Sequence, residues 1–167
     1  YVSDTATYTY DIDGELGGNT ISCTINAAGI EINETNFPNE TFRNYVKSFD
    51  NDKNNTLSGT EIAEVTSIDV SDKGISDLKG IEYFTALKTL SCYSNQLTSL
   101  DVSRCTALTE LYCYDNSLTS LDVSKNTALT ELSCYSNPLT RLDVSNNTAL
   151  TALYCYDNSL TSLDVSK

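Results

Sequence analysis

The chain has 167 residues, a net charge of −13 at neutral pH and a pI of about 4.1. Such an acidic surface repels phosphate backbones and anionic headgroups, so nucleic acid is disfavoured as a partner, and no apolar run reaches the ~18 residues needed for membrane insertion. The chain has no histidine, the commonest general base, and contains no nucleophile elbow or phosphate-binding loop, so it is not expected to be an enzyme.

Residues 1–33 predict an N-terminal β-segment. Apolar and polar side chains alternate over residues 8–12 and again over residues 21–25. The turn-rich residues 13–19 separate these runs, which indicates a β-hairpin. A third short strand is expected at residues 30–32.

Residues 34–64 change to a helical period and predict a small cap with two helices. Asn36 is the expected N-cap of a helix that opens at Phe37 and Pro38, because proline is tolerated in a first turn. Apolar residues then recur at helical spacing, at Phe42, Tyr45, Val46 and Phe49. A second helix is expected from Gly59 to about Val65.

The twelve residues from Asp50 to Glu61 have the ligand spacing of an EF-hand calcium loop. Asn55 stands where glycine is usual, and asparagine tolerates the positive φ required there. Ser58 and Glu61 also have the spacing of a capping box for the next helix. The alternative is a metal-free helix–loop–helix cap that keeps only the shape of the loop. The predicted Ca²⁺ ligands are Asp50, Asp52, Asn54, the Thr56 carbonyl, Ser58 through water, and Glu61.

Residues 65–167 contain a repeat with a fixed period of 21 residues, and periods of 20 to 29 residues are typical of a leucine-rich-repeat solenoid. A degenerate turn of 22 residues precedes four 21-residue repeats that begin at Leu87, Leu108, Leu129 and Leu150. The fold class is therefore an α/β repeat solenoid with a concave parallel β-sheet, a helical EF-hand-like cap and an N-terminal β-hairpin. No carboxy-terminal cap is expected.

Alternation along each short strand places Leu90 and Cys92 inward and Ser91 and Tyr93 outward, with the same pattern in later repeats. Tyrosine offers contact area at low entropic cost together with a hydroxyl, which suits recognition of a protein or glycan. The alternative is that the stacked rings only stabilise neighbouring strands. The predicted ligand-binding residues are Tyr93, Tyr112, Tyr114, Tyr135, Tyr154, Tyr156, Glu110 and Glu131.

Three further columns of repeated residues are expected to be structural. The cysteines at 92, 113, 134 and 155 are expected as buried reduced thiols, with a Cys23–Cys105 disulfide as a separate possibility. The asparagines at 95, 116, 137 and 158 should bond the backbone of adjacent turns. The aspartates at 101, 122, 143 and 164 would repel one another unless serine hydroxyls, backbone amides or cations offset the charge.

The repeat Leu-x-x-Leu-x-Cys-x-x-Asn-x-Leu-x-x-Leu-Asp-Val-Ser resembles the 21-residue cysteine-ladder repeats of the internalins, a family of bacterial surface proteins. Residues 36–84 resemble the EF-hand-like amino-terminal cap of the same family. The resemblance implies an extracellular, non-enzymatic role at a bacterial surface, in recognition or adhesion, with the concave face as ligand site. The alternative hypothesis is a structural subunit that self-associates head-to-tail into a filament, through its N-terminal β-segment and an open solenoid end.

Overall fold

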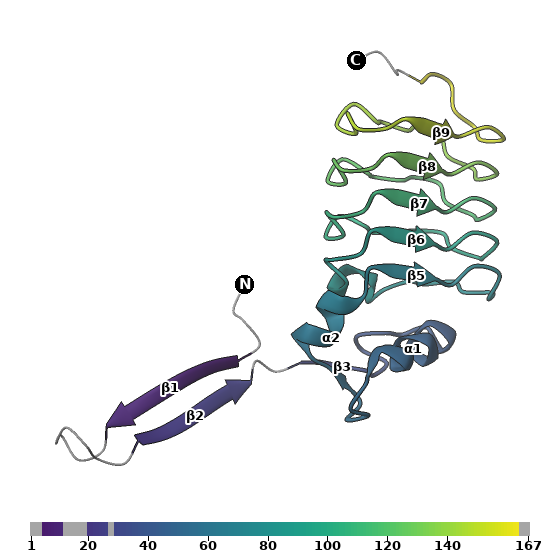
Figure 1. Ribbon diagram of the computed structural model, residues 1–167. Helices are drawn as coiled ribbons and strands as arrows, with labels where there is room; N and C mark the ends of the chain where they lie inside the picture. Colours follow the sequence, from purple (N-terminus) through teal and green to yellow (C-terminus); the bar gives the residue numbers. More distant parts are fainter. Residues whose placement is uncertain (1–4, 12–19, 27–28, 164–167) are drawn as a thin grey trace.

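The computed structural model describes residues 29–163 and, for their backbone alone, residues 5–11 and 20–26. The described strands form three sheets. Strands β1 (Thr5–Asp11) and β2 (Thr20–Asn26) form a hairpin, and β3 (Ile30–Glu31) pairs with β4 (Thr56–Leu57). Figure 1 shows the solenoid rising from a small cap, with the hairpin extending away from that cap. No helix in the described ranges is long and apolar enough to cross a membrane.

The predicted N-terminal hairpin is confirmed. Its strands are antiparallel, with Tyr8 opposite Cys23 and Tyr10 opposite Ile21. The expected connection at residues 13–19 lies outside the described residues. The expected third strand is β3, and it joins the cap by pairing antiparallel with β4.

The cap contains helix α1 (Glu40–Val46), a 3-10 turn η1 (Lys47–Phe49) and helix α2 (Gly59–Glu64). The prediction that Asn36 caps the first helix was wrong. Asn39 is the N-cap, and its side chain accepts a hydrogen bond from the Phe42 amide at 3.0 Å. The helix starts late because a residue that precedes proline, here Phe37, is held away from the helical region.

Aromatic side chains join the cap to the first turn of the solenoid. The ring of Phe37 packs edge-on against Phe42 and Tyr83, and Phe49 packs in the same way against Phe84. A Cβ atom at Gly80 would lie 2.3 Å from the Phe37 ring, and the φ of Gly80 is +103°. Only glycine fits both constraints, and the 3-10 turn η2 (Ile81–Tyr83) follows directly.

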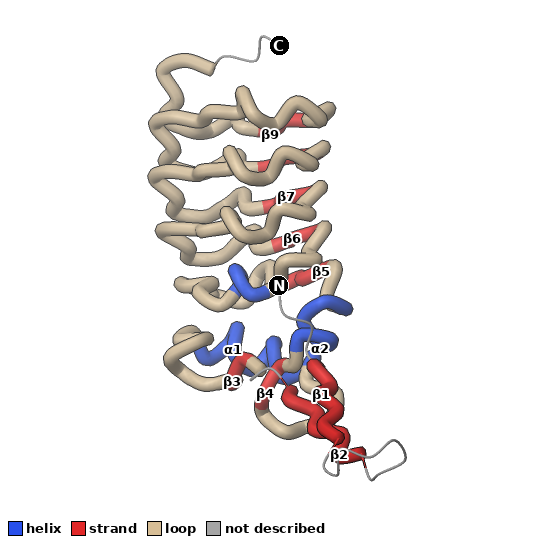
Figure 2. Tube along the Cα trace, turned by 90° about the vertical axis from the view of Figure 1, so that its left-hand side faces the viewer, coloured by secondary structure: helices blue, strands red, loops and turns tan. Residues whose placement is uncertain are grey.

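The solenoid carries one parallel five-stranded sheet. Its first step is 22 residues, from Ile68 to Leu90, and each later step is 21, as the repeat spacing predicted. In Figure 2 the strands lie one above another on one side, and turns without helices close each of the repeats from residue 85 to 163. The strands are β5 (Ser67–Asp69), β6 (Thr89–Ser91), β7 (Glu110–Tyr112), β8 (Glu131–Ser133) and β9 (Ala152–Tyr154).

Candidate functional site

Four tyrosines on the sheet side form a continuous stack, which we call the tyrosine ladder. Neighbouring rings have centroids 4.4 Å apart and interplanar angles of 6–10°. Strands in register lie about 4.8 Å apart, so identical outward side chains come within stacking distance. The ladder consists of Tyr93, Tyr114, Tyr135 and Tyr156.

A second column runs beside the tyrosine ladder and alternates in size. Ser91, Tyr112, Ser133 and Tyr154 follow one another in the strand register. Tyr154 is 47% exposed, whereas Ser133, between two tyrosines, is 4% exposed. The prediction placed Ser133 on the outward surface; the structure keeps it on the sheet side but buries it.

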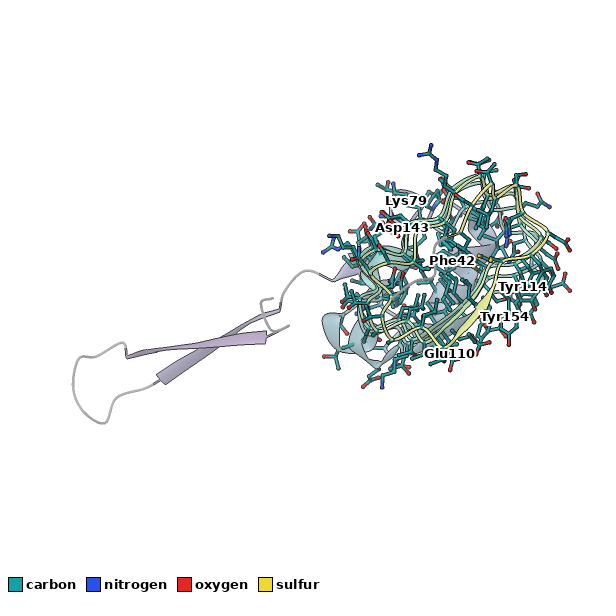
Figure 3. The ribbon with its side chains drawn as sticks, turned by 90° about the horizontal axis from the view of Figure 1, so that it is seen from above. Phe42, Lys79, Glu110, Tyr114, Asp143 and Tyr154 are labelled. Carbon is teal, nitrogen blue, oxygen red and sulfur yellow. The ribbon has the colours of Figure 1, made fainter. Side chains whose placement is uncertain are left out.

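The third column lies at the start of the strands, at Thr89, Glu110 and Glu131, and it carries two carboxylates. The Tyr112 hydroxyl donates to Glu110 at 3.4 Å, and the Thr89 hydroxyl donates to the same oxygen at 3.4 Å. Burial, together with the charges of Glu110 and Glu131, raises the pKa of Tyr112 to about 12. Figure 3, which looks down the solenoid, places Glu110, Tyr154 and Tyr114 along the sheet side and Lys79 and Asp143 away from it.

The sheet side carries acidic side chains in two of its three columns. Its three columns contain no lysine or arginine from β5 to β9, while Asp69 adds a carboxylate to the second column. Asp115 and Asp157 directly follow ladder tyrosines. A positively charged partner is therefore attracted to this side and a negatively charged one repelled.

A strained backbone position follows each ladder tyrosine, and sequence analysis missed it. Ser94, Asp115, Ser136 and Asp157 all have φ of 51–52°. The left-handed region is unfavourable for most residues but tolerable for small polar ones. The sequence did contain a signal for this backbone conformation, because serine or aspartate always stands immediately before the repeated asparagine.

The asparagine column has the predicted structural role. Asn137 donates its amide to the carbonyls of Cys113, Cys134 and Tyr135, and its oxygen accepts from the Leu118 amide at 2.9 Å. Each asparagine thus joins its own turn to the preceding one. Asn95, Asn116 and Asn158 bond in the same way.

A second asparagine column lies on the far side of the solenoid, at Asn126 and Asn147, both fully buried. Asn126 donates to the carbonyls of Val102 and Cys105. Cys105 occupies the equivalent place one turn earlier, and its thiol contacts the Ile81 carbonyl at 3.5 Å. Its sulfur is buried and free, so the considered Cys23–Cys105 disulfide is wrong.

The repeated cysteines are free thiols, as predicted. Cys92, Cys113 and Cys134 are fully buried. Burial raises the pKa of Cys92 and of Cys134 to about 12, with a smaller contribution from Cys155 to the latter. Thiols with such values carry almost no thiolate, which makes them poor nucleophiles and metal ligands.

The aspartate column is stabilised by local hydrogen bonds. The amides of Ser103, Ser124 and Ser145 donate to Asp101, Asp122 and Asp143, each at 2.9 Å. Hydrogen bonds from serine hydroxyls and amides lower the pKa of Asp101 and of Asp122. The predicted serine hydroxyls and backbone amides both contribute, and the positive charge of Lys125 also lowers the pKa of Asp122. Asp164 lies outside the described residues.

The Asp50–Glu61 loop brings three of the predicted ligands together. Carboxylate oxygens of Asp50, Asp52 and Glu61 lie within 4.8 Å of one another. Ligand oxygens around one Ca²⁺ are separated by at most about 4.8 Å, twice a bond length of about 2.4 Å, so these residues fit a calcium site. The φ of Asn55 is 63°, as its predicted glycine-like role requires.

The other predicted ligands lie in the same loop with partners of their own. The Asn54 side chain donates to Asp52 at 2.8 Å, and Thr56 begins β4. Ser58 and Glu61 form the predicted capping box of α2, and the Asn51 amide donates to the second Glu61 oxygen at 2.6 Å. Hydrogen bonds from the Ser58 and Asn51 amides lower the pKa of Glu61, while burial and the charge of Asp50 oppose this shift. Each carboxylate oxygen has two lone pairs, so capping leaves capacity for a cation.

The repeat, the sheet and the buried thiol column together define a leucine-rich-repeat solenoid with a cysteine ladder. Residues 85–126 match the family model described as Leucine Rich repeats (2 copies). The chain is homologous to internalin J of Listeria monocytogenes serotype 4b (strain F2365), with 39% identity over 88 residues. The chain thus has a leucine-rich-repeat fold, and its repeats are similar to those of internalin J.

Solved structures agree with this class. The functional domain of internalin J from Listeria monocytogenes, which includes a cysteine ladder, matches with a TM-score of 0.77 and 43% identity over 84% of this chain. An internalin, InlF, from strain 4b F2365 matches with a TM-score of 0.68 and 20% identity over 81% of this chain and 48% of that one, which supports the fold alone. The sequence match to internalin J covers 52% of this chain and 10% of that protein. The structural match covers 32% of the solved internalin J domain. This chain therefore spans only a small part of the length of these relatives.

Proposed function

We propose that this protein is a non-enzymatic recognition module at the outer surface of a bacterial cell, and that its sheet side binds a protein partner with a basic surface. The observation that carries the proposal is the tyrosine ladder, beside which run two columns that contain carboxylates and no lysine or arginine. Tyrosine-rich, partly exposed surfaces are typical of protein-binding sites.

The stacking geometry favours a protein over a glycan. Tyr114 is stacked against Tyr93 and Tyr135, so both faces of its ring are covered. A sugar ring would need an open aromatic face to stack on, whereas ring edges and hydroxyls remain available to a polypeptide surface. Glu110 and Glu131 supply acceptors for lysine or arginine side chains.

The binding test uses immobilised chain with lysine-rich and arginine-rich model peptides, and an acidic peptide of equal length as the negative probe. Binding of the basic peptides should weaken with salt and fall in Glu110→Gln/Glu131→Gln and in Tyr114→Ser/Tyr135→Ser. The matched control is Glu40→Gln/Glu64→Gln, which removes two exposed charges from the cap. Equal loss in the control would show that net charge, and not the sheet side, attracts the peptides.

We also propose that the Asp50–Glu61 loop binds Ca²⁺ with moderate affinity, because only three carboxylates contribute. Asp50, Asp52 and Glu61 would hold the ion, with Asn54, the Thr56 carbonyl and Ser58 completing the oxygen set. The ion would stiffen the cap by neutralising three carboxylates within 4.8 Å of one another. Calorimetric titration should give one site in the native chain and none in Asp50→Asn/Asp52→Asn, while Glu64→Gln binds as the native chain does.

Self-association is a second candidate, favoured by one observation. The β1–β2 hairpin is a two-stranded sheet of its own, and such a pair is marginally stable without further partners. Its edges offer backbone groups to a strand of another copy. Light scattering across concentration, with and without residues 1–28, tests this. Filaments that persist after removal of the hairpin would reject it as the assembly device.

A further inference from the structure

The tyrosine ladder has a chemical property that recognition does not use. Its four phenol rings are held face to face at 4.4 Å, in a row that crosses four turns of the solenoid. Three neighbouring pairs therefore exist, each joining residues that are 21 apart in sequence. A phenol that loses an electron here already has a second phenol as its nearest aromatic neighbour.

We propose that the tyrosine ladder is a site of oxidative cross-linking, in which neighbouring ladder tyrosines couple to dityrosine and covalently staple adjacent turns. The co-reactant is a one-electron oxidant of the peroxidase class with hydrogen peroxide. The proposal is independent of the partner that the sheet side binds.

The reaction balances without any other group. Two phenols each give up one electron and one proton, which yields two phenoxyl radicals and reduces one hydrogen peroxide to two waters. The radicals couple through ring carbons next to the oxygens, forming one carbon–carbon bond. Each coupled carbon then passes its hydrogen to the neighbouring oxygen, which restores both phenols. The chain loses two hydrogen atoms per link.

The geometry suits this coupling. The ring centres in the ladder are already about as close as those of two directly bonded rings, so the rings must rotate in place but the turns need not move apart. Tyr112 and Tyr154 provide the contrast within the same sheet. They lie two turns apart, about 9.6 Å along the sheet, with Ser133 between them, and cannot couple to each other in the folded solenoid.

The composition removes the side chains that usually compete for oxidising equivalents. The chain contains no methionine, tryptophan or histidine. The thiols of Cys92, Cys113 and Cys134 are fully buried on the opposite side of the strands, whereas the free thiol of Cys155, which directly precedes Tyr156, is only partly buried. Tyr156, by contrast, is 57% exposed at one end of the ladder, where an oxidant reaches it. An oxidising equivalent that reaches Tyr114 or Tyr135, in the middle of the ladder, therefore has no exposed thiol beside it and is expected to remain on tyrosine.

The test treats the 167-residue chain at low concentration with peroxidase and limiting hydrogen peroxide, and follows dityrosine fluorescence and peptide mass. Trypsin separates the ladder tyrosines, because it cleaves after Lys88, Arg104, Lys125 and Arg141. The expected products are the peptide pairs 89–104 with 105–125, 105–125 with 126–141, and 126–141 with 142–167, each lighter by two hydrogens. Their yield per chain should not depend on protein concentration, and the urea midpoint should rise after oxidation.

The deciding variant is Tyr114→Phe/Tyr135→Phe, which keeps the rings but removes the phenols from the middle of the ladder. It should lose the intramolecular links while keeping the circular dichroism of the native chain. The matched control, Tyr112→Phe/Tyr154→Phe, removes two tyrosines from the neighbouring column and should link as the native chain does. Links that persist in the first variant, that fall equally in the control, or that form mainly between chains would overturn the proposal.

Discussion

Replacing Asn137 by alanine tests the physical account of the solenoid most directly. Its side chain is 5% exposed, donates both amide hydrogens to carbonyls of two adjacent turns, and accepts one bond from the Leu118 amide. Removal of this side chain therefore affects three hydrogens that take part in hydrogen bonds: the two on the Asn137 amide nitrogen and the one on the Leu118 backbone nitrogen. At about 1 kcal/mol net for each, Asn137→Ala should lower the free energy of unfolding by about 3 kcal/mol. For a chain of this size that corresponds to a fall in Tm of about 6–12 °C.

Urea unfolding followed by circular dichroism measures this loss. The m-value should stay constant, because the surface exposed on unfolding is unchanged. Asn146→Ala is the matched control, since Asn146 is exposed, and it should change the free energy of unfolding by less than about 0.5 kcal/mol. Asn137→Asp should be worse than alanine at neutral pH, because a carboxylate oxygen would face the Cys113 carbonyl. A loss below about 1 kcal/mol for Asn137→Ala would refute the role assigned to the column.

Three further predictions follow from the same structure. Cys113→Ser places a hydroxyl among buried apolar groups and should lower the free energy of unfolding by about 1–3 kcal/mol. Cys113→Val keeps the site apolar and should lower it by less than about 1.5 kcal/mol. Equal urea midpoints for the two variants would contradict this prediction. Ser136 has a φ of 51°, so Ser136→Val should cost about 1–2 kcal/mol in thermal unfolding and Ser136→Gly should not. The pKa of Asp101 is lowered by hydrogen bonds from Ser103, so its contribution to stability is present above the ordinary aspartate pKa and is lost as pH falls through the lowered value. Urea midpoints of Ser103→Ala should therefore depend less on pH in this acidic range than those of the native chain.

The repeat spacing alone located the solenoid, its strands and its inward residues. A constant period means that one operation relates successive turns, so a residue type repeated every 21 positions must form a column. Alternation along each strand then assigns Leu90 and Cys92 to the core and Tyr93 to the outer side. These assignments needed no knowledge of how the turns pack.

The cap shows where local patterns were insufficient. The sequence analysis placed the N-cap at Asn36, two residues before Pro38, whereas the structure places it at Asn39. The Phe37 amide donates to the Asn33 carbonyl at 2.9 Å, which commits this segment to an earlier turn and leaves Asn39 to open the helix. The position of the N-cap thus depends on how the Phe37 ring packs against Phe42 and Tyr83. The contact with Tyr83 joins segments that are far apart in sequence.

The sequence by itself determined the fold, the columns and the ligand spacing of the Asp50–Glu61 loop, because these depend on residue type and period. Only the tertiary structure decided how the columns meet one another. It set the 4.4 Å stacking of the tyrosine ladder, the burial of Ser133 and the left-handed backbone at Ser94 and its equivalents. Those properties arise from the distance and register between turns, which are created when the core residues pack and are not encoded within any single repeat.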